Sequence, residues 1–502
     1  MLFNSVPFLA YFLPVVVVVA LLLGRAGQKE ACKVWLLLAS AFFYGYWAWP
    51  YLFLLFGTII VNFFTGKMLS APDRAQGQRR AIMIASVSFN LGLLFVFKYF
   101  NFFIENIDFL FGFDIQVFKV ILPLGISFFT FQQIAFLADA YQRKLDEGYS
   151  FVDYALFISF FPQLIAGPIV HHKDLVPQFK SGLFARPTSE MFASGVAIII
   201  IGLFKKAVLA DSISPAVNTL FGEAAAGAHL TLMEAWLATL GFAGQIYFDF
   251  SGYSDIAIGL ALLFGLRMPE NFRAPYRAIS IVEFWRRWHI TLSDFLRDYL
   301  YIPLGGNRRG KVRRYINLMT TMLLGGLWHG AAWTFVIWGG LHGAYLTVNH
   351  MFNSMVKGSG FETGLSSLPV RFLGWALTFF AVCFAWIFFR AENLEAANNV
   401  VRGFLGFNGV NIPPGLNVFL DLPPKFATKT PAASSLFTDG SQWRTLVEAI
   451  CFTLLGLVVA FSQTKERGSQ RARLIAVVVV IGFVIQAIFF GVASEEFIYF
   501  QF

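Results

Sequence analysis

Residues 6–24 read VPFLAYFLPVVVVVALLLG, an uncharged run long enough to cross the hydrocarbon core of a bilayer as a helix. No basic residue precedes this run, whereas Arg25, Lys29 and Lys33 follow it. A cleaved signal peptide has the opposite order, with its positive charge ahead of the apolar run and a small-residue cleavage site behind it. Basic residues mark the cytoplasmic side of a span. The run therefore predicts an uncleaved first span with its N-terminus outside.

The same apolar character continues through the rest of the 502 residues, of which 57% are hydrophobic and 13% are charged. A soluble domain has about 25% charged residues, so this chain lacks the polar surface to cover itself in water. We predict an all-α polytopic membrane protein with roughly 10–12 transmembrane or re-entrant helices of about 20 residues each, plus interfacial helices. Further apolar runs occupy residues 34–64 (two short spans), 81–98, 119–140, 191–210, 232–266, 316–347, 371–389, 445–462 and 474–492.

Prolines and glycines interrupt several of these runs, as in residues 121–125 (ILPLG) and 161–168 (FPQLIAGP). Broken backbone at membrane depth is tolerated only where it is buried in protein or lines a wet cavity. The predicted architecture is therefore a helical bundle around a central, partly hydrated funnel, with residues 1–502 forming a single domain.

The connecting loops differ in charge, and this difference predicts which side of the membrane they occupy. Residues 67–80 and 463–473 are rich in Lys and Arg and should be cytoplasmic. Residues 408–440 are rich in Pro, Gly, Ser and Thr, and we expect a variable outer loop that contacts a partner. The formal net charge of +9 fits an inner-membrane protein. No basic domain stands apart from the spans, so we expect no nucleic-acid binding.

Ionisable residues concentrate in residues 267–314, and charged groups inside an apolar bundle are candidate functional groups. The core of this stretch, residues 283–303, reads EFWRRWHITLSDFLRDYLYIP; on a helix, Trp285, Trp288 and His289 would share one face. Snorkelling arginines on an interfacial helix would explain most of the basic residues. A cationic vestibule for an anionic donor, such as a phosphopantetheine or coenzyme A group, would explain them as well. No Walker-type loop or dinucleotide fingerprint accompanies the cluster.

A second concentration is residues 323–333, LLGGLWHGAAW, where His329 stands among glycines and apolar residues. An imidazole at membrane depth must find polar partners or water, and the flanking glycines allow close approach of another backbone or a ligand. His329 is therefore a candidate functional residue. On a continuous helix His342 would lie about 20 Å further along the axis. We expect His342 to be a packing residue that does not share a reaction centre with His329.

Other motifs indicate little function. His171 and His172 sit in a polar loop with no third cluster to complete a metal site. The spacing of His289 and Asp294 matches the HxxxxD dyad of glycerolipid acyltransferases, but Asp294 is equally explained as a helix-face partner for an arginine. No GxSxG turn supplies a serine nucleophile. Three cysteines far apart in sequence are expected to be small apolar core residues rather than a disulfide or zinc framework: Cys32, Cys383 and Cys451.

Seven stretches stand out when read together: residues 125–130 (GISFFT), 165–168 (IAGP), 245–259 (QIYFDFSGYSDIAIG), 271–276 (NFRAPY), 283–293 (EFWRRWHITLS), 298–308 (DYLYIPLGGNR) and 325–330 (GGLWHG). In combination they resemble the membrane-bound O-acyltransferase superfamily. They are most similar to its bacterial alginate O-acetyltransferase branch, whose relatives acetylate peptidoglycan and cellulose or transfer D-alanine to teichoic acid.

The resemblance implies transfer of an acyl group from a cytoplasmic donor, acetyl-CoA or another acyl carrier, to a hydroxyl on the outer side. The family's essential histidine falls on His329 and its second histidine on His289, within a catalytic core region at residues 267–347. His171, His172 and Asp294 fall outside the family's pattern, which further weakens the metal and HxxxxD readings. No bound cofactor and no metal are expected. The expected substrate-lining residues are Trp288, Asn271, Tyr276 and Trp328.

These implications predict a bacterial inner-membrane O-acetyltransferase for an exported polysaccharide, acting on the polymer or through a serine of a periplasmic acetyltransferase. Expected partners are membrane lipids, the polysaccharide acceptor, and that acetyltransferase or polysaccharide-export subunits. His329 would be the general base, available as neutral imidazole near neutral pH, and His289 would orient or polarise the acyl carbonyl. An acyl-imidazole intermediate on His329 is the alternative mechanism.

Other functions stay open from sequence alone. Within the same superfamily, the chain would instead transfer D-alanine or acylate peptidoglycan. A transporter of an acyl donor would need no chemistry, although the missing internal repeat weighs against it. A scaffold for an export complex is the third class.

Overall fold

The computed structural model describes residues 1–113, 115, 121–145, 148–357, 367–410 and 497. Within these residues all regular secondary structure is helical, which confirms the predicted all-α class. Several predicted features lie outside the described residues: the spans at 445–462 and 474–492, the tract 463–473, and the 408–440 loop beyond residue 410.

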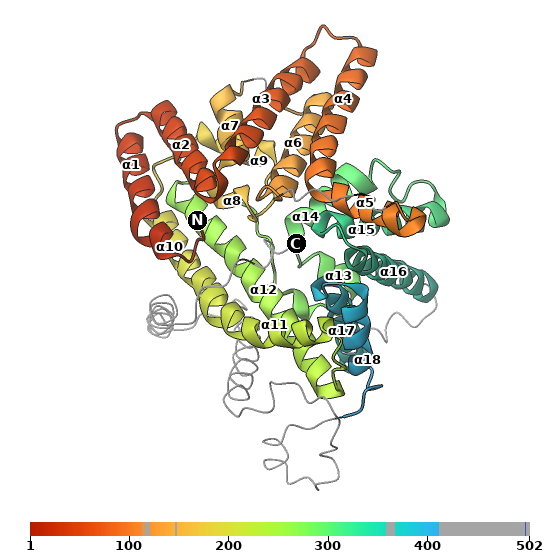
Figure 1. The fold of residues 1–502 in the computed structure, drawn as a ribbon. Helices are drawn as coiled ribbons and strands as arrows, with labels where there is room; N and C mark the ends of the chain where they lie inside the picture. The colour runs from red at the N-terminus through yellow and green to blue at the C-terminus, as the bar shows by residue number, and fades with distance from the viewer. Residues whose placement is uncertain (114, 116–120, 146–147, 358–366, 411–496, 498–502) are drawn as a thin grey trace.

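The N-terminal part of the chain forms the upper group of helices in Figure 1. The apolar run at 34–64, predicted as two short spans, divides into two helices because Pro50 has no N–H to continue a helix and is well placed in the first turn of a new one. The elements are η1 (Pro7–Phe12), α1 (Leu13–Arg25), α2 (Lys29–Ala48), α3 (Pro50–Ser70), α4 (Gln76–Leu94), η2 (Phe95–Tyr99), α5 (Phe100–Phe111), α6 (Ile126–Tyr141), α7 (Phe151–Ser159), α8 (Phe161–Leu164) and α9 (His172–Phe179).

A pair of long helical stretches crosses the molecule diagonally below this group (Figure 1). It consists of α10 (Ser189–Leu203), η3 (Phe204–Ala210) and α11 (Asp211–Ala225) packed along α12 (Leu232–Leu263). Glycines set how closely the two stretches approach. A Cβ atom on Gly195 would lie 2.8 Å from the carbonyl oxygen of Gly259, so a larger residue would push the helices apart. Small residues at such crossings are typical of helix packing in membranes.

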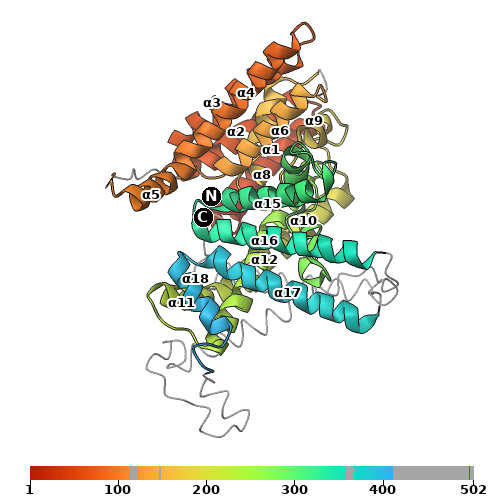
Figure 2. The same ribbon diagram turned by 90° about the vertical axis from the view of Figure 1, so that its right-hand side faces the viewer.

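The third group carries the region that the sequence marked as the catalytic core. Its helices α15, α16 and α17 lie side by side in Figure 2. The elements are η4 (Pro275–Arg277), α13 (Ile281–Trp285), α14 (Ile290–Leu296), η5 (Arg297–Tyr301), α15 (Gly310–His329), α16 (Trp333–Val356), α17 (Leu368–Arg390) and α18 (Leu394–Phe404).

Six stretches of the described chain are long and apolar enough to cross a membrane, which makes this a polytopic membrane protein. Two of them are longer than predicted, because the helices continue through π-helical turns at η2 and η3. The predicted total of 10–12 segments stays a prediction. The six stretches are Pro7–Arg25, Pro50–Ser70, Gln76–Phe111, Ser189–Ala225, Leu232–Leu263 and Leu368–Arg390.

The apolar run at 316–347 is not one helix, contrary to the assumption used to separate His329 from His342. Helix α15 ends at His329, Gly330 has extended backbone, and α16 begins at Trp333. The two helices form an antiparallel hairpin in which Gly326 of α15 meets the backbone of Phe335 and Gly339 on α16. The hairpin requires glycine at this contact, because a side chain there would overlap the opposing backbone.

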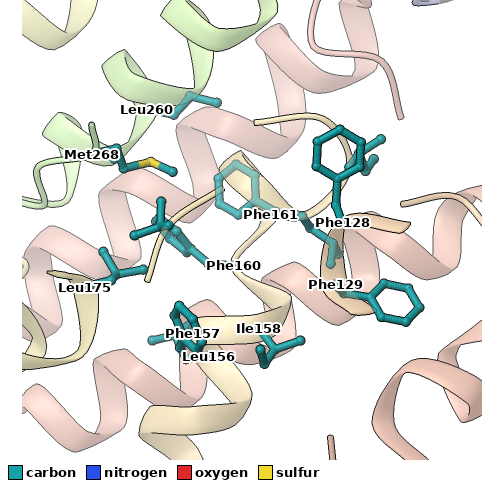
Figure 3. Packing of buried hydrophobic residues seen from close by; sticks show 14 of the residues in the cluster. Phe128, Phe129, Leu156, Phe157, Ile158, Phe160, Phe161, Leu175, Leu260 and Met268 are labelled. Atoms are coloured by element: carbon teal, nitrogen blue, oxygen red, sulfur yellow. The ribbon is translucent and has the colours of Figure 1, made fainter. Parts of the chain in front are cut away.

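Buried apolar side chains form two clusters. Figure 3 shows part of the first cluster, where Phe160 and Phe161 lie between residues of α7 and Leu260 of α12. The second cluster joins α11 and α12 to α13, α16, α17 and α18. Cys32 lies in the first cluster and Cys383 in the second, both as free thiols, which confirms the expected role of these two as core residues, while Cys451 lies outside the described residues. Trp328 belongs to the first cluster and Trp338 to the second, and the histidine between them is His329.

Candidate active site

His329 is the last residue of α15, and its side chain is held by aromatic rings from three helices. The ring centroid of the imidazole lies 4.9 Å from that of Trp328, 5.0 Å from Trp338 on α16 and 5.1 Å from Phe389 on α17. The residue is 4% exposed. Because α15 stops here and α16 turns back, the imidazole faces rings of the neighbouring helices α16 and α17.

His342 lies close to the same group of rings, which corrects the predicted separation of about 20 Å. Its imidazole centroid is 4.7 Å from Trp338, the indole that also contacts His329. The indole Nε1–H of Trp285 donates to His342 Nδ1 at 3.2 Å. An Nδ1 that accepts a hydrogen bond carries no proton, so His342 is held as the neutral tautomer with its proton on Nε2. A packing role for His342 stays a prediction.

His289 does not lie on a continuous helix with Trp285 and Trp288, as the sequence predicted. Its backbone is left-handed, with φ of +42°, and it caps the start of α14. Two backbone hydrogen bonds to a remote segment hold this conformation: Ile290 N–H donates to the Asn271 carbonyl, and Arg273 N–H donates to the Arg287 carbonyl, both at 2.9 Å. A left-handed non-glycine residue costs on the order of 1–3 kcal/mol and persists only where its surroundings fix it.

The side chain of Asn271 fixes the tautomer of His289. Asn271 Oδ1 accepts from the backbone N–H of Thr291 at 3.3 Å and from the Thr291 hydroxyl at 2.9 Å, which identifies this atom as the oxygen of the amide. His289 Nδ1 lies 3.1 Å from the same oxygen. An amide oxygen cannot donate, so Nδ1 carries the proton and Nε2 of the neutral ring is left with a lone pair. This Nε2 is buried and has no hydrogen-bond partner among the described residues.

Trp328 connects the two predicted catalytic histidines. Its ring centroid lies 4.9 Å from His329 and 6.1 Å from His289. The structure thus brings His289 and His329, forty positions apart in the sequence, to the same indole. The prediction that His289 lies on a continuous helix with Trp285 and Trp288 was wrong.

A cavity of about 480 Å³ has His329 in its lining. Trp328 and His329 form part of its wall, and the N-terminal residues, the end of α2, the segment 122–125 and the start of α6 form most of the rest. Polar groups in the lining include Lys98 and Ser127. The imidazole that the sequence selected therefore has access to a space large enough for a small ligand group.

A family model of the membrane-bound O-acyltransferases matches residues 113–394, which contain His289, His329 and the α6 and α15 walls of the cavity. The chain belongs to this family. It is an acyltransferase, and the predicted family and branch are confirmed.

Three relatives show the range of the family around this chain. The peptidoglycan O-acetyltransferase of Helicobacter pylori is 43% identical over 437 residues, covering 82% of this chain and 81% of the relative. The probable alginate O-acetylase AlgI of Pseudomonas aeruginosa is 39% identical over 413 residues, covering 81% and 75%. The teichoic acid D-alanyltransferase of Bacillus subtilis is 28% identical over 277 residues, covering 54% and 69%.

Among the four residues expected to line the acyltransferase substrate site, Trp328 faces the cavity. Asn271 instead holds His289. The Tyr276 hydroxyl donates to the Ala243 carbonyl at 2.7 Å, and Trp288 stacks on Phe284 within the second apolar cluster. Substrate contact by Asn271, Tyr276 and Trp288 stays a prediction.

Lys98 is the site residue that the sequence analysis missed. Its Nζ donates to the carbonyls of Trp328 at 2.6 Å and His329 at 2.9 Å, and it lines the cavity. The signal was present, since Lys98 closes the apolar run at 81–98 and an ionisable residue within a span is a functional candidate by default. A single lysine at the end of an apolar run is a weaker signal than the dense charges of residues 267–314.

The remaining sequence candidates lie away from the cavity lining. His172 is not in a polar loop but begins α9 and is buried among aromatic rings, while His171 stacks on Tyr299. Asp294 pairs with Arg297 at 2.6 Å, which confirms its reading as a helix-face partner. Among the described residues, no group of three or more His, Cys, Asp or Glu could hold a metal ion. The basic side chains of residues 267–314 are exposed or half-exposed, as snorkelling arginines would be.

Proposed function

We propose that this acyltransferase takes an acetyl group from a cytoplasmic donor and passes it, at the outer side of the bacterial inner membrane, to a hydroxyl of an exported polysaccharide or of a periplasmic acetyltransferase that serves it. The observation that carries the proposal is the cavity that ends at His329. The names of the relatives, which act on peptidoglycan and alginate, support an acetyl group and a polysaccharide.

Charge supports an outward-facing cavity. Basic residues gather at one end of the N-terminal helices, where the Lys29 ammonium donates to the Lys180 carbonyl and Arg143 donates to the Pro72 carbonyl. The α1–α2 and α3–α4 turns point this way, away from the N-terminus (Figure 1). The positive-inside rule assigns that end to the cytoplasm. The cavity is lined by Met1, Leu2 and the far end of α2, which supports an opening on the opposite, outer side.

The chemistry follows from the placement of the two imidazoles. His329 lines the cavity and takes the proton of the attacking hydroxyl as general base. His289 was expected to polarise the acyl carbonyl, which requires a donor. Because Asn271 holds the Nδ1–H of neutral His289, the remaining Nε2 has a lone pair and no proton to donate. We therefore propose that His289 accepts a hydrogen bond and does not polarise the acyl carbonyl. The carbonyl must then be polarised by another group.

The proposal is tested by supplying acetyl-labelled coenzyme A to one face of sealed membrane vesicles that contain the full chain, its polymer and its periplasmic partners. Label should reach the polymer or a periplasmic protein when the donor contacts the cytoplasmic face, and should stay at background when the donor is outside. A parallel D-alanyl thioester donor should give no transfer. Equal labelling from both faces, or D-alanyl transfer in place of acetyl transfer, would contradict the proposal.

A further inference from the structure

Lys98 is placed beside His329 by a local irregularity in a long helix. It lies in the π-helical turn η2, between α4 and α5 of the continuous stretch Gln76–Phe111. Its ammonium donates to the carbonyls of Trp328 and His329, the last two residues of α15. Short π-helical insertions of this kind are frequent at functional sites.

The charge of Lys98 is not neutralised by an acid. Within the described residues, no carboxylate lies at ion-pair distance from its Nζ. The ammonium is held instead by carbonyls at the negative end of α15, where a cation is favoured. An ammonium has three N–H donors. Two donate to the α15 carbonyls, and the third donates to Ser127 Oγ in the cavity wall at 3.5 Å.

The start of α6 adds positive potential to the same wall. Gly125, Ile126, Ser127 and Phe128 all line the cavity, so the N-terminal end of this helix, the positive end of its dipole, is directed there. Gly125 has φ of +71°, and a Cβ at this position would lie 2.7 Å from the Leu164 carbonyl oxygen. Glycine is therefore required for α6 to begin at the cavity.

The base His329 and the positive groups, Lys98 and the N-terminal end of α6, thus line one cavity. His289 in its neutral form cannot donate to the acyl carbonyl, because its Nδ1–H is held by Asn271. We propose that the ammonium of Lys98 and the hydroxyl of Ser127 form the oxyanion-binding site of the acyl transfer. This inference rests on the proposed function, and it names the groups that polarise the acyl carbonyl.

The proposed step balances as follows. The acceptor oxygen bonds to the carbonyl carbon of the donor thioester, and its proton goes to His329. The carbonyl π electrons move to the carbonyl oxygen, whose negative charge is stabilised by Lys98 and Ser127. The oxyanion's electron pair then re-forms the carbonyl double bond as the C–S bond breaks, and the departing thiolate takes the proton from His329. Donors aimed at the developing charge stabilise the transition state more than the substrate.

Ser127→Ala in the full chain is the sharper test, because it removes one donor and leaves the anchor of α15 in place. We expect kcat to fall on the order of 10²-fold, the scale for loss of one oxyanion-hole donor, with little change in KM. Lys98→Met should fall at least as far, and Lys98→Arg should recover part of the loss because it retains a cationic donor. Thermal unfolding of each purified variant reports whether the fold is kept.

Two matched variants control for the loss of a buried hydroxyl and of a carbonyl-bound ammonium. Ser86→Ala removes a hydroxyl that bonds within α4, and Lys67→Met removes an ammonium bonded to the Tyr149 carbonyl. Both should keep wild-type kcat. An unchanged kcat in Ser127→Ala and Lys98→Met would overturn the inference. A raised KM for the acceptor with an unchanged kcat would also overturn it, because Lys98 and Ser127 would then bind an anionic acceptor in its ground state. If His329→Ala is fully active, the proposed function fails instead.

Discussion

Asn271 determines what His289 can do, although it does not line the described cavity. Its amide oxygen receives three contacts, from Thr291 N–H, the Thr291 hydroxyl and His289 Nδ1. We predict that Asn271→Leu lowers the free energy of unfolding by about 1–3 kcal/mol for each buried donor left unpaired. It should also lower kcat, because the His289 ring loses its fixed tautomer.

Thermal unfolding and acetyl transfer, measured on the same purified variant, check this prediction. Asn349→Leu is the matched control, since that amide on α16 contacts Asn353 rather than the site, and it should leave kcat unchanged. Wild-type stability and wild-type kcat in Asn271→Leu would show that the network has no such role.

Individual residues were predictable where their immediate sequence was unusual. His329 stood out because a histidine among glycines within an apolar run is costly at membrane depth. The backbone of His289 could not be predicted, because its left-handed conformation depends on hydrogen bonds to residues 271–273, which no local pattern shows. Lys98 carried a local signal, but its hydrogen bonds to α15 join residues more than two hundred positions apart.

The α15–α16 hairpin is the element that holds His329 at the cavity. We predict that Gly326→Ala destabilises the protein by about 1–3 kcal/mol, the usual cost of overpacking, because the added methyl overlaps the Phe335 carbonyl. It should also reduce acetyl transfer, since the end of α15 must move. Gly92→Ala on α4 has open space around the added methyl and should preserve both properties. Equal thermal stability and activity of the two variants would contradict this account of the hairpin.

Most elements were predicted close to where they lie, because long apolar runs between charged turns define helices in a bilayer. The run at 316–347 was the main error. Its composition is apolar throughout, and the reversal at residues 330–332 depends on glycines that meet another backbone rather than on a proline or a charge. The lengths of two spans were also underestimated, because π-helical turns continue a helix without any sequence break.

At the scale of the whole molecule, acetyl transfer to an outer acceptor requires that the cavity face the outer side of the membrane. We predict that a cysteine at Tyr46, in the cavity wall, reacts with a membrane-impermeant maleimide added outside intact cells stripped of their outer membrane. A cysteine at Asp73, in the α3–α4 turn, should react after the inner membrane is opened. Native Cys32 and Cys383 are buried and should contribute little label. The reverse pattern would place the cavity on the cytoplasmic side.

The class of the molecule was evident from composition, and the branch of the family from the joint occurrence of short stretches. The cavity was not predictable in detail, because the N-terminus, α2, α6 and α15 contribute to it from distant parts of the chain. Three of the stretches that suggested the family, residues 125–130, 165–168 and 325–330, contribute residues to the cavity wall.

The most direct test of the central claim is acetyl transfer by the purified full chain in detergent, where donor and acceptor share one compartment. His329→Ala is compared with wild type and with His350→Ala, a histidine further along α16, at matched protein levels. Loss of a general base predicts a fall in kcat of about 10²–10⁴-fold for His329→Ala, with His350→Ala unchanged. Undiminished transfer by His329→Ala would contradict the claim that this imidazole performs the chemistry.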